Sequence, residues 1–126
     1  MDKAALVNID IDRGSIILAA LDGAGLDVRV ALWLYASEYE DWRLVLSSPQ
    51  FEGGTLEDRR RVNEALDAAG IPAENVPPKL LLRMSDPFIK ALRAIFGEAR
   101  SVEGMRLSGQ MIGNRWVEDA FVYRIS

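Results

Sequence analysis

The side chains that could do chemistry in this 126-residue chain are carboxylates, amines, guanidinium groups and hydroxyls, because it contains neither cysteine nor histidine. These two absences exclude disulfides, thiol nucleophiles, imidazole bases, and zinc sites built from cysteine or histidine. What remains is acid–base catalysis by carboxylates, and Mg²⁺ or Mn²⁺ bound by oxygen ligands.

Three short runs of carboxylates are candidates for that chemistry. The run "DID" at 10–12 begins a predicted helix, where acidic residues serve as caps. The run "EYED" at 38–41 falls in a predicted hairpin loop and lacks the glycine and ligand spacing of a calcium-binding loop. Glu118 and Asp119 are adjacent on a predicted strand, so their side chains point to opposite faces. We therefore expect no catalytic residue, no metal ion and no cofactor.

The charge of the chain argues against a nucleic-acid partner. The formal net charge is −4 and the isoelectric point is about 4.8, whereas nucleic-acid binders carry a basic surface that neutralises phosphates. The one basic run, at 59–61, is surrounded by acidic residues and is typical of a solvated helix face.

A membrane location is not expected either. No window approaches the roughly 18 uninterrupted apolar residues of a membrane-spanning helix. The first ten residues lack the basic start and apolar core of a signal peptide. The sequence therefore predicts a cytoplasmic protein.

The elements that position these residues follow from periodicity and end signals. Thr55 and Asp58 form a weak capping box, and Asp86-Pro87 begins another helix. The pair Gly113-Asn114 predicts a two-residue hairpin turn that sets Met111 opposite Trp116. The predicted elements are helices over about 9–24, 55–69 and 87–96, strands over about 27–36, 42–48 and 79–84, and a final hairpin over 105–125.

This order predicts one α+β domain over residues 1–126, with two layers and a mixed five-stranded sheet whose three helices lie mainly on one face. The connections on either side of strand 79–84 are long enough for crossovers that make both neighbouring strand pairs parallel. In the first hairpin, we expect the even-numbered residues of 28–34 to share a face with those of 42–46. That register requires a loop with an odd number of residues.

One face of this sheet is the predicted binding surface. The first strand is apolar on both faces, yet helices on one side cover only one of them. Soluble monomers rarely expose a large apolar patch, and Trp, Tyr and Arg dominate binding hot spots. The residues expected on the uncovered face are Trp33, Tyr35, Arg43, Arg83, Trp116 and Glu118.

Several occupants of that face are compatible with the sequence. The first helix or a loop could fold over it, a second copy could close it as a homodimer, or a different protein could bind there. We expect a non-enzymatic interaction module that associates with itself. The alternative is a small-molecule-binding protein or a carboxylate- or arginine-dependent enzyme, with Arg43, Arg83 and Glu118 lining a pocket on the open face.

Three stretches of the chain carry a resemblance to other proteins. They are "ALWLY…WRLVLSSP" at 31–49, "SDPFIKALR" at 85–93 and "VEDAFVYRI" at 117–125. These segments resemble those of small uncharacterised bacterial proteins of similar length and element order. The resemblance implies a bacterial, cytoplasmic origin and assigns no activity to any residue.

Overall fold

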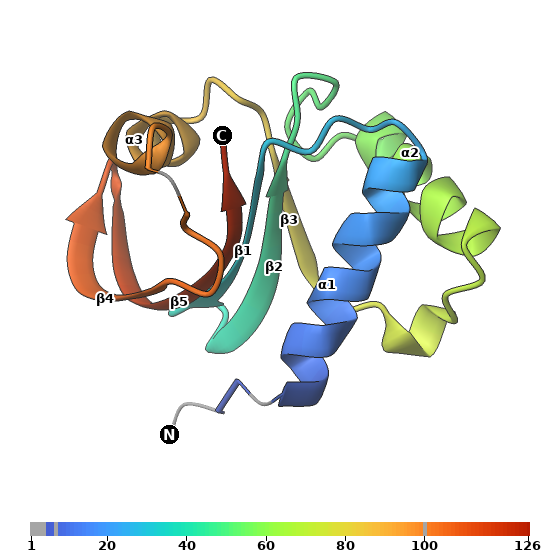
Figure 1. The fold of residues 1–126 in the computed structure, drawn as a ribbon, viewed down its shortest axis with the longest axis horizontal. Coiled ribbons are helices and arrows are strands. Elements are labelled where there is room, and N and C mark those ends of the chain that lie inside the picture. The colour runs from blue at the N-terminus through green and yellow to red at the C-terminus, as the bar shows by residue number, and fades with distance from the viewer. Residues whose placement is uncertain (1–4, 7, 100) are drawn as a thin grey trace.

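Five strands form one sheet in the computed structural model, which describes residues 5–6, 8–99 and 101–126 (Figure 1). The strand order is β3-β2-β1-β5-β4, with β2 and β3 parallel and the other neighbours antiparallel. The predicted α+β class, the mixed five-stranded sheet and the order of elements are confirmed. In chain order the elements are α1 (Asn8–Gly23), β1 (Val30–Ala36), β2 (Asp41–Ser47), α2 (Leu56–Ala68), the 3₁₀ helix η1 (Ala73–Asn75), β3 (Lys79–Leu82), α3 (Pro87–Phe96), β4 (Arg106–Ile112) and β5 (Arg115–Ile125).

The starts of α2 and α3 lie where the sequence predicts them. The Thr55 hydroxyl accepts a hydrogen bond from the Asp58 backbone N–H, which completes the capping box of α2. The Asp86 carboxylate accepts one from the Phe88 N–H at 2.9 Å, and Pro87 is the first residue of α3. Both helix starts depend on residues close together in sequence, and such local signals predict structure well.

The helices are divided between the two faces of the sheet. Helices α1 and α2 cover the face that bears Trp33 and Tyr35, while α3 covers the face that bears Leu32 and Leu34 (Figure 1). The predicted open face is therefore closed, and the alternative that the first helix folds over it is confirmed. The helix residues buried on the first side are Ile17, Leu18, Leu21, Val62, Ala65 and Leu66, and those on the second are Phe88, Ile89 and Leu92.

The first hairpin adopts a different register from the predicted one. Leu32 lies opposite Val45, and the loop contains the four residues 37–40. Trp42 and Leu44 consequently share a face with the odd-numbered residues of β1. The prediction of an odd loop is wrong because β1 is apolar on both faces, so the apolar pattern fits both registers equally well.

The crossovers follow the prediction in one case only. The parallel pairing of β2 with β3 through α2 is confirmed. Strands β3 and β4 instead lie at opposite edges of the sheet, so the predicted parallel pair between them is wrong. The second crossover spans the sheet because β5 pairs with the free edge of β1 and leaves β4 outermost.

The last hairpin curves around α3 (Figure 1). The predicted pairing of Met111 with Trp116 is confirmed. Gly109 has a φ of +62°, which interrupts the regular alternation of side chains along β4. Odd-numbered Leu107 faces the core before this glycine, and even-numbered Ile112 faces it afterwards. Leu107 and Ile112 are therefore both buried against α3 although five positions separate them in the strand.

Candidate functional site

Two of the six predicted binding residues are part of the core. Trp33 is 3% exposed and Tyr35 is 8% exposed, and both lie beneath α1 and α2. The Tyr35 ring packs edge-on against Trp42 with ring centroids 5.8 Å apart. These aromatic side chains therefore hold the helices on the sheet and present little surface to a partner.

The predicted polar group of Arg43, Arg83 and Glu118 is spread over the molecule. Arg43 lies on β2 on the α3 side, with its guanidinium 4.2 Å from the centre of the Tyr39 ring. Arg83 follows β3, where Leu82 pairs with Ser47, which places it about 16 Å from Arg43 along the strand direction. Glu118 is exposed on β5, so the three side chains do not line one pocket.

A polar contact inside the α1 face joins three distant segments. Trp33 Nε1 donates a hydrogen bond to the Tyr123 hydroxyl at 2.9 Å, and that hydroxyl donates to the Ile11 carbonyl at 2.6 Å. Tyr123 lies at a β-bulge, where the register between β1 and β5 shifts. The approach of α1 is close because Gly14 faces the Tyr123 hydroxyl, and a Cβ atom there would lie 2.3 Å from its oxygen.

The Tyr123 hydroxyl has a displaced pKa. Burial raises its pKa to about 12, the hydrogen bond from Trp33 opposes the rise, and the carboxylates of Asp12 and Asp10 add to it. The neutral phenol is thus favoured in the folded state more than in the unfolded chain, whose ordinary pKa is 10.0. This contact stabilises the fold below pH 10 and loses that contribution as the pH rises through about 12.

We predict a fall in the free energy of unfolding across this alkaline range. The difference between wild type and Tyr123→Phe should shrink by up to about 2 kcal/mol between pH 10 and pH 12. Urea unfolding at a series of pH values measures it, and the phenylalanine variant subtracts the titration of every other group. An unchanged difference across this range would contradict the assignment.

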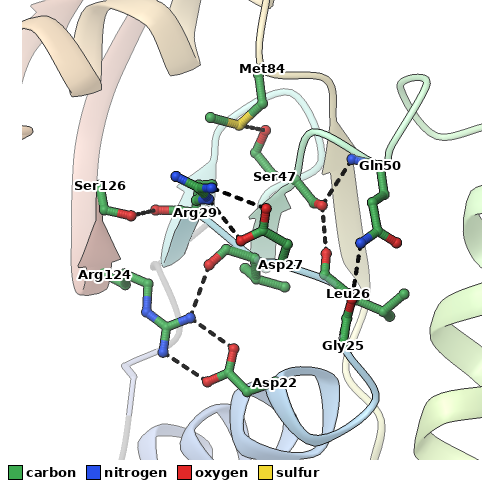
Figure 2. Close-up of polar contacts among 12 residues, drawn as sticks. Asp22, Gly25, Leu26, Asp27, Arg29, Ser47, Gln50, Met84, Arg124 and Ser126 are labelled. Atoms are coloured by element: carbon green, nitrogen blue, oxygen red, sulfur yellow. Dashed lines mark hydrogen bonds and ion pairs between the residues drawn. The ribbon is translucent and has the colours of Figure 1, made fainter.

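A second polar network fastens the end of α1 to the sheet (Figure 2). The Arg124 guanidinium donates to both oxygens of Asp22, at 2.9 and 2.8 Å, and to the Val28 carbonyl at 2.9 Å. The hydrogen bond from Arg124 lowers the pKa of Asp22. Ser48 Oγ donates to the Leu26 carbonyl at 2.6 Å nearby. These groups are engaged with one another, and their arrangement fixes the connection from α1 to β1.

The loop before α2 wraps around a buried carboxylate. The Asp58 oxygens accept hydrogen bonds from the four consecutive backbone N–H groups of 52–55, at 2.9 to 3.4 Å. Asp58 is 1% exposed; burial raises its pKa, but the four backbone donors outweigh burial and the pKa is lowered. Such a concave set of N–H groups commonly binds an anion, and here the bound anion is the Asp58 carboxylate, which belongs to the helix that follows the loop.

Two open surfaces of the described residues are candidates for binding a partner. A hollow of about 480 Å³ runs along β3, between that strand and the loop glycines Gly53 and Gly54. On the last hairpin, Met111 is 60% exposed and Trp116 is 55% exposed. Among the described residues, the core beneath α1 and α2 contains none from β4, so neither of these helices covers this face of the hairpin, while α3 packs on the other face.

The described part of the chain offers no obvious metal chemistry. Within residues 5–6, 8–99 and 101–126, no group of three carboxylates is placed to hold a metal ion. In the same residues, no helix combines the length and the apolar character needed to cross a bilayer.

Comparisons with known proteins add no further indication of function. No family model, no curated protein and no solved structure matches this chain. Two open surfaces of the described residues, the hollow along β3 and the exposed pair on the last hairpin, remain as candidate binding sites.

Proposed function

We propose that this protein is an interaction module that forms a homodimer through the outer face of the β4–β5 hairpin. The observation that carries the proposal is the exposed pair of Trp116 and Met111. The two residues lie directly opposite each other on neighbouring strands, so their side chains share one face. Each is more than half exposed, and both tryptophan and methionine are residue types that are enriched in protein interfaces.

The energetics favour burial of this pair. An aromatic side chain buries about 150–250 Å² when it is enclosed, and aromatic anchors contribute a large share of binding energy. A methionine adds roughly 1.5–3 kcal/mol when it is fully buried. A partner surface that covers both side chains therefore gains from each of them.

The shape of the hairpin suits a second copy of itself. In the continuing register Gly109 lies opposite Glu118, two positions from the Met111–Trp116 pair, and a Cβ atom on this glycine would meet open space. The surface therefore places a projecting indole beside a flat stretch of backbone. A two-fold interface needs such a projection and its complement on the same patch, and two-fold dimers are the commonest oligomers.

Light scattering after size-exclusion chromatography tests this proposal. We expect a molar mass near twice 14.0 kDa for the wild type, and a mass near 14.0 kDa for Trp116→Ala at the same concentration. The dissociation constant should rise at least about tenfold. The matched control is Leu56→Ala, because Leu56 is exposed on α2, well separated from the hairpin, and its loss should leave the mass unchanged. A monomeric wild type, or a Trp116→Ala dimer as tight as the wild type, would contradict the proposal.

A further inference from the structure

The outer edge of β3 carries backbone groups that have no hydrogen-bond partner among the described residues. This strand ends the sheet, with β2 as its neighbour. The Leu44 N–H donates to the Pro78 carbonyl at 3.0 Å. Because backbone groups alternate in direction along a parallel strand, Lys79 and Leu81 turn their N–H and C=O groups toward the outer edge. Within the part of the chain that the structure describes, no backbone hydrogen bond reaches these four groups.

The hollow beside this edge is kept open by glycine. Its walls are β3 on one side and Gly53, Gly54 and Arg59 on the other. Gly54 comes so near that a Cβ atom there would lie 3.3 Å from the outward carbonyl oxygen of Leu81. Both glycines have positive φ values, +117° and +83°, which other residues rarely adopt. The loop thus follows the strand edge with backbone alone, and the hollow of about 480 Å³ remains open beside the strand.

Three cations lie around the hollow. Arg59 and Lys79 line it, and the Arg83 side chain lies against Gly53. Among the described residues, no carboxylate lies within ion-pair distance of any of the three. Burial lowers the pKa of Lys79. The arginines that do pair with carboxylates are Arg29, Arg60, Arg61, Arg106, Arg115 and Arg124.

The nearby acids do not neutralise this group. Asp58 is buried and engaged by the loop N–H groups, and Glu57 is bonded to Arg60 and Arg61 on another side of α2. Glu52 is exposed in the same loop, but a single carboxylate is outnumbered by the three cations, so positive charge is in excess beside the strand edge. In a chain of net charge −4, this local excess is a distinct feature of the surface.

We propose that an extended acidic segment of a partner protein adds as a strand to the outer edge of β3. The backbone of the segment would bond the outward N–H and C=O of Lys79 and the outward N–H of Leu81, and its carboxylates would meet the three cations. Leu80 and Leu82, both half-buried, offer apolar contacts for its alternate side chains. A second copy of this chain is disfavoured here, because a two-fold axis would bring the same cations together. This site is separate from the proposed dimer surface and binds a different partner.

A short fluorescent peptide of alternating glutamate and valine tests the inference by polarisation. We expect saturable binding with a dissociation constant below about 1 mM, and slower amide hydrogen exchange at Lys79 and Leu81. The measurement is made with the wild type and repeated with Trp116→Ala, so that failure of the dimer proposal leaves this result unaffected. A peptide N-methylated on alternate residues keeps the charge but cannot pair as a strand, and it should bind at least about tenfold more weakly.

Charge variants locate the site. Arg59→Gln combined with Arg83→Gln should weaken binding about tenfold, and both residues are exposed, so the fold should be kept. The control is Arg60→Gln, adjacent on the same helix, whose guanidinium is engaged by Glu57 and Glu64 and should not matter. The inference is overturned by absent binding, by equal binding of the N-methylated peptide or of a lysine–valine peptide, or by tighter binding of a single-stranded oligonucleotide of equal charge.

Discussion

Gly14→Ala is expected to destabilise the protein by about 3 kcal/mol, although a glycine-to-alanine change inside a helix normally stabilises it by about 0.5–1 kcal/mol. The sign is reversed because the new methyl group would lie 2.3 Å from the Tyr123 hydroxyl oxygen and 2.9 Å from Trp33 Nε1. Relief of this overlap requires α1 to move away from the sheet. Overpacking alone costs about 1–3 kcal/mol, and the two hydrogen bonds of Tyr123 add about 1 kcal/mol each when lost.

Urea unfolding followed by tryptophan fluorescence measures this change, since Trp33 lies at the contact. Gly23→Ala is the matched control: it lies in the same helix, and a Cβ atom there meets nothing within 4 Å. Its free energy of unfolding should equal or slightly exceed that of the wild type. Adding Tyr123→Phe to Gly14→Ala should recover part of the loss, because the closest atom is then absent. A Gly14→Ala protein as stable as Gly23→Ala would show that α1 does not approach the sheet this closely.

Asp58→Ala is expected to cost about 4 kcal/mol, the largest effect of any carboxylate on α2. The substitution removes the buried acceptor that the four N–H groups of 52–55 share, and a hydrogen bond to a charged group contributes about 1.5–3 kcal/mol. Asp58→Asn should cost less, because one oxygen remains as an acceptor. The asparagine amide N–H₂ group would, however, face backbone N–H groups of the loop, and two donors cannot form a hydrogen bond with each other.

The lowered pKa of Asp58 gives this effect a pH dependence of known sign. A carboxylate whose folded pKa lies below its unfolded value contributes stability that is complete above the unfolded value, near 3.8, and is lost as the pH falls through the folded one. The wild type should therefore lose stability in this acid range more steeply than Asp58→Ala. Asp67→Asn, an exposed position on the same helix, controls for the change in net charge. Equal acid profiles for wild type and Asp58→Ala would contradict the role of the carboxylate.

Features set by neighbouring residues could be predicted from the sequence. The capping box at Thr55, the start of α3 at Asp86 and the turn at Gly113 each depend on backbone groups a few residues away. The register of the first hairpin could not, because β1 is apolar on both faces and offers no polar residue to mark the outside. The same ambiguity concealed which face each helix would cover.

The contacts between distant segments could not be predicted from the sequence for a different reason. Trp33 and Tyr123 are 90 positions apart, and no local pattern joins them. One signal was present: Gly14 interrupts a helix without ending it, and such a glycine often marks the close approach of another element. In the basic run, Arg60 and Arg61 do pair with acids of their own helix, as expected of a solvated face, whereas Arg59 borders the hollow instead.

The position of β1 between β2 and β5 has a consequence for synthesis of the chain. One neighbour of this strand, β2, is made directly after it, while the other, β5, is made only after α2, β3, α3 and β4. Until then, the "VALWLYA" edge of β1 is a long, uncharged template for pairing with other chains. We therefore expect a chain that stops before β5 to aggregate more readily than the full chain, because this edge of β1 then stays unpaired.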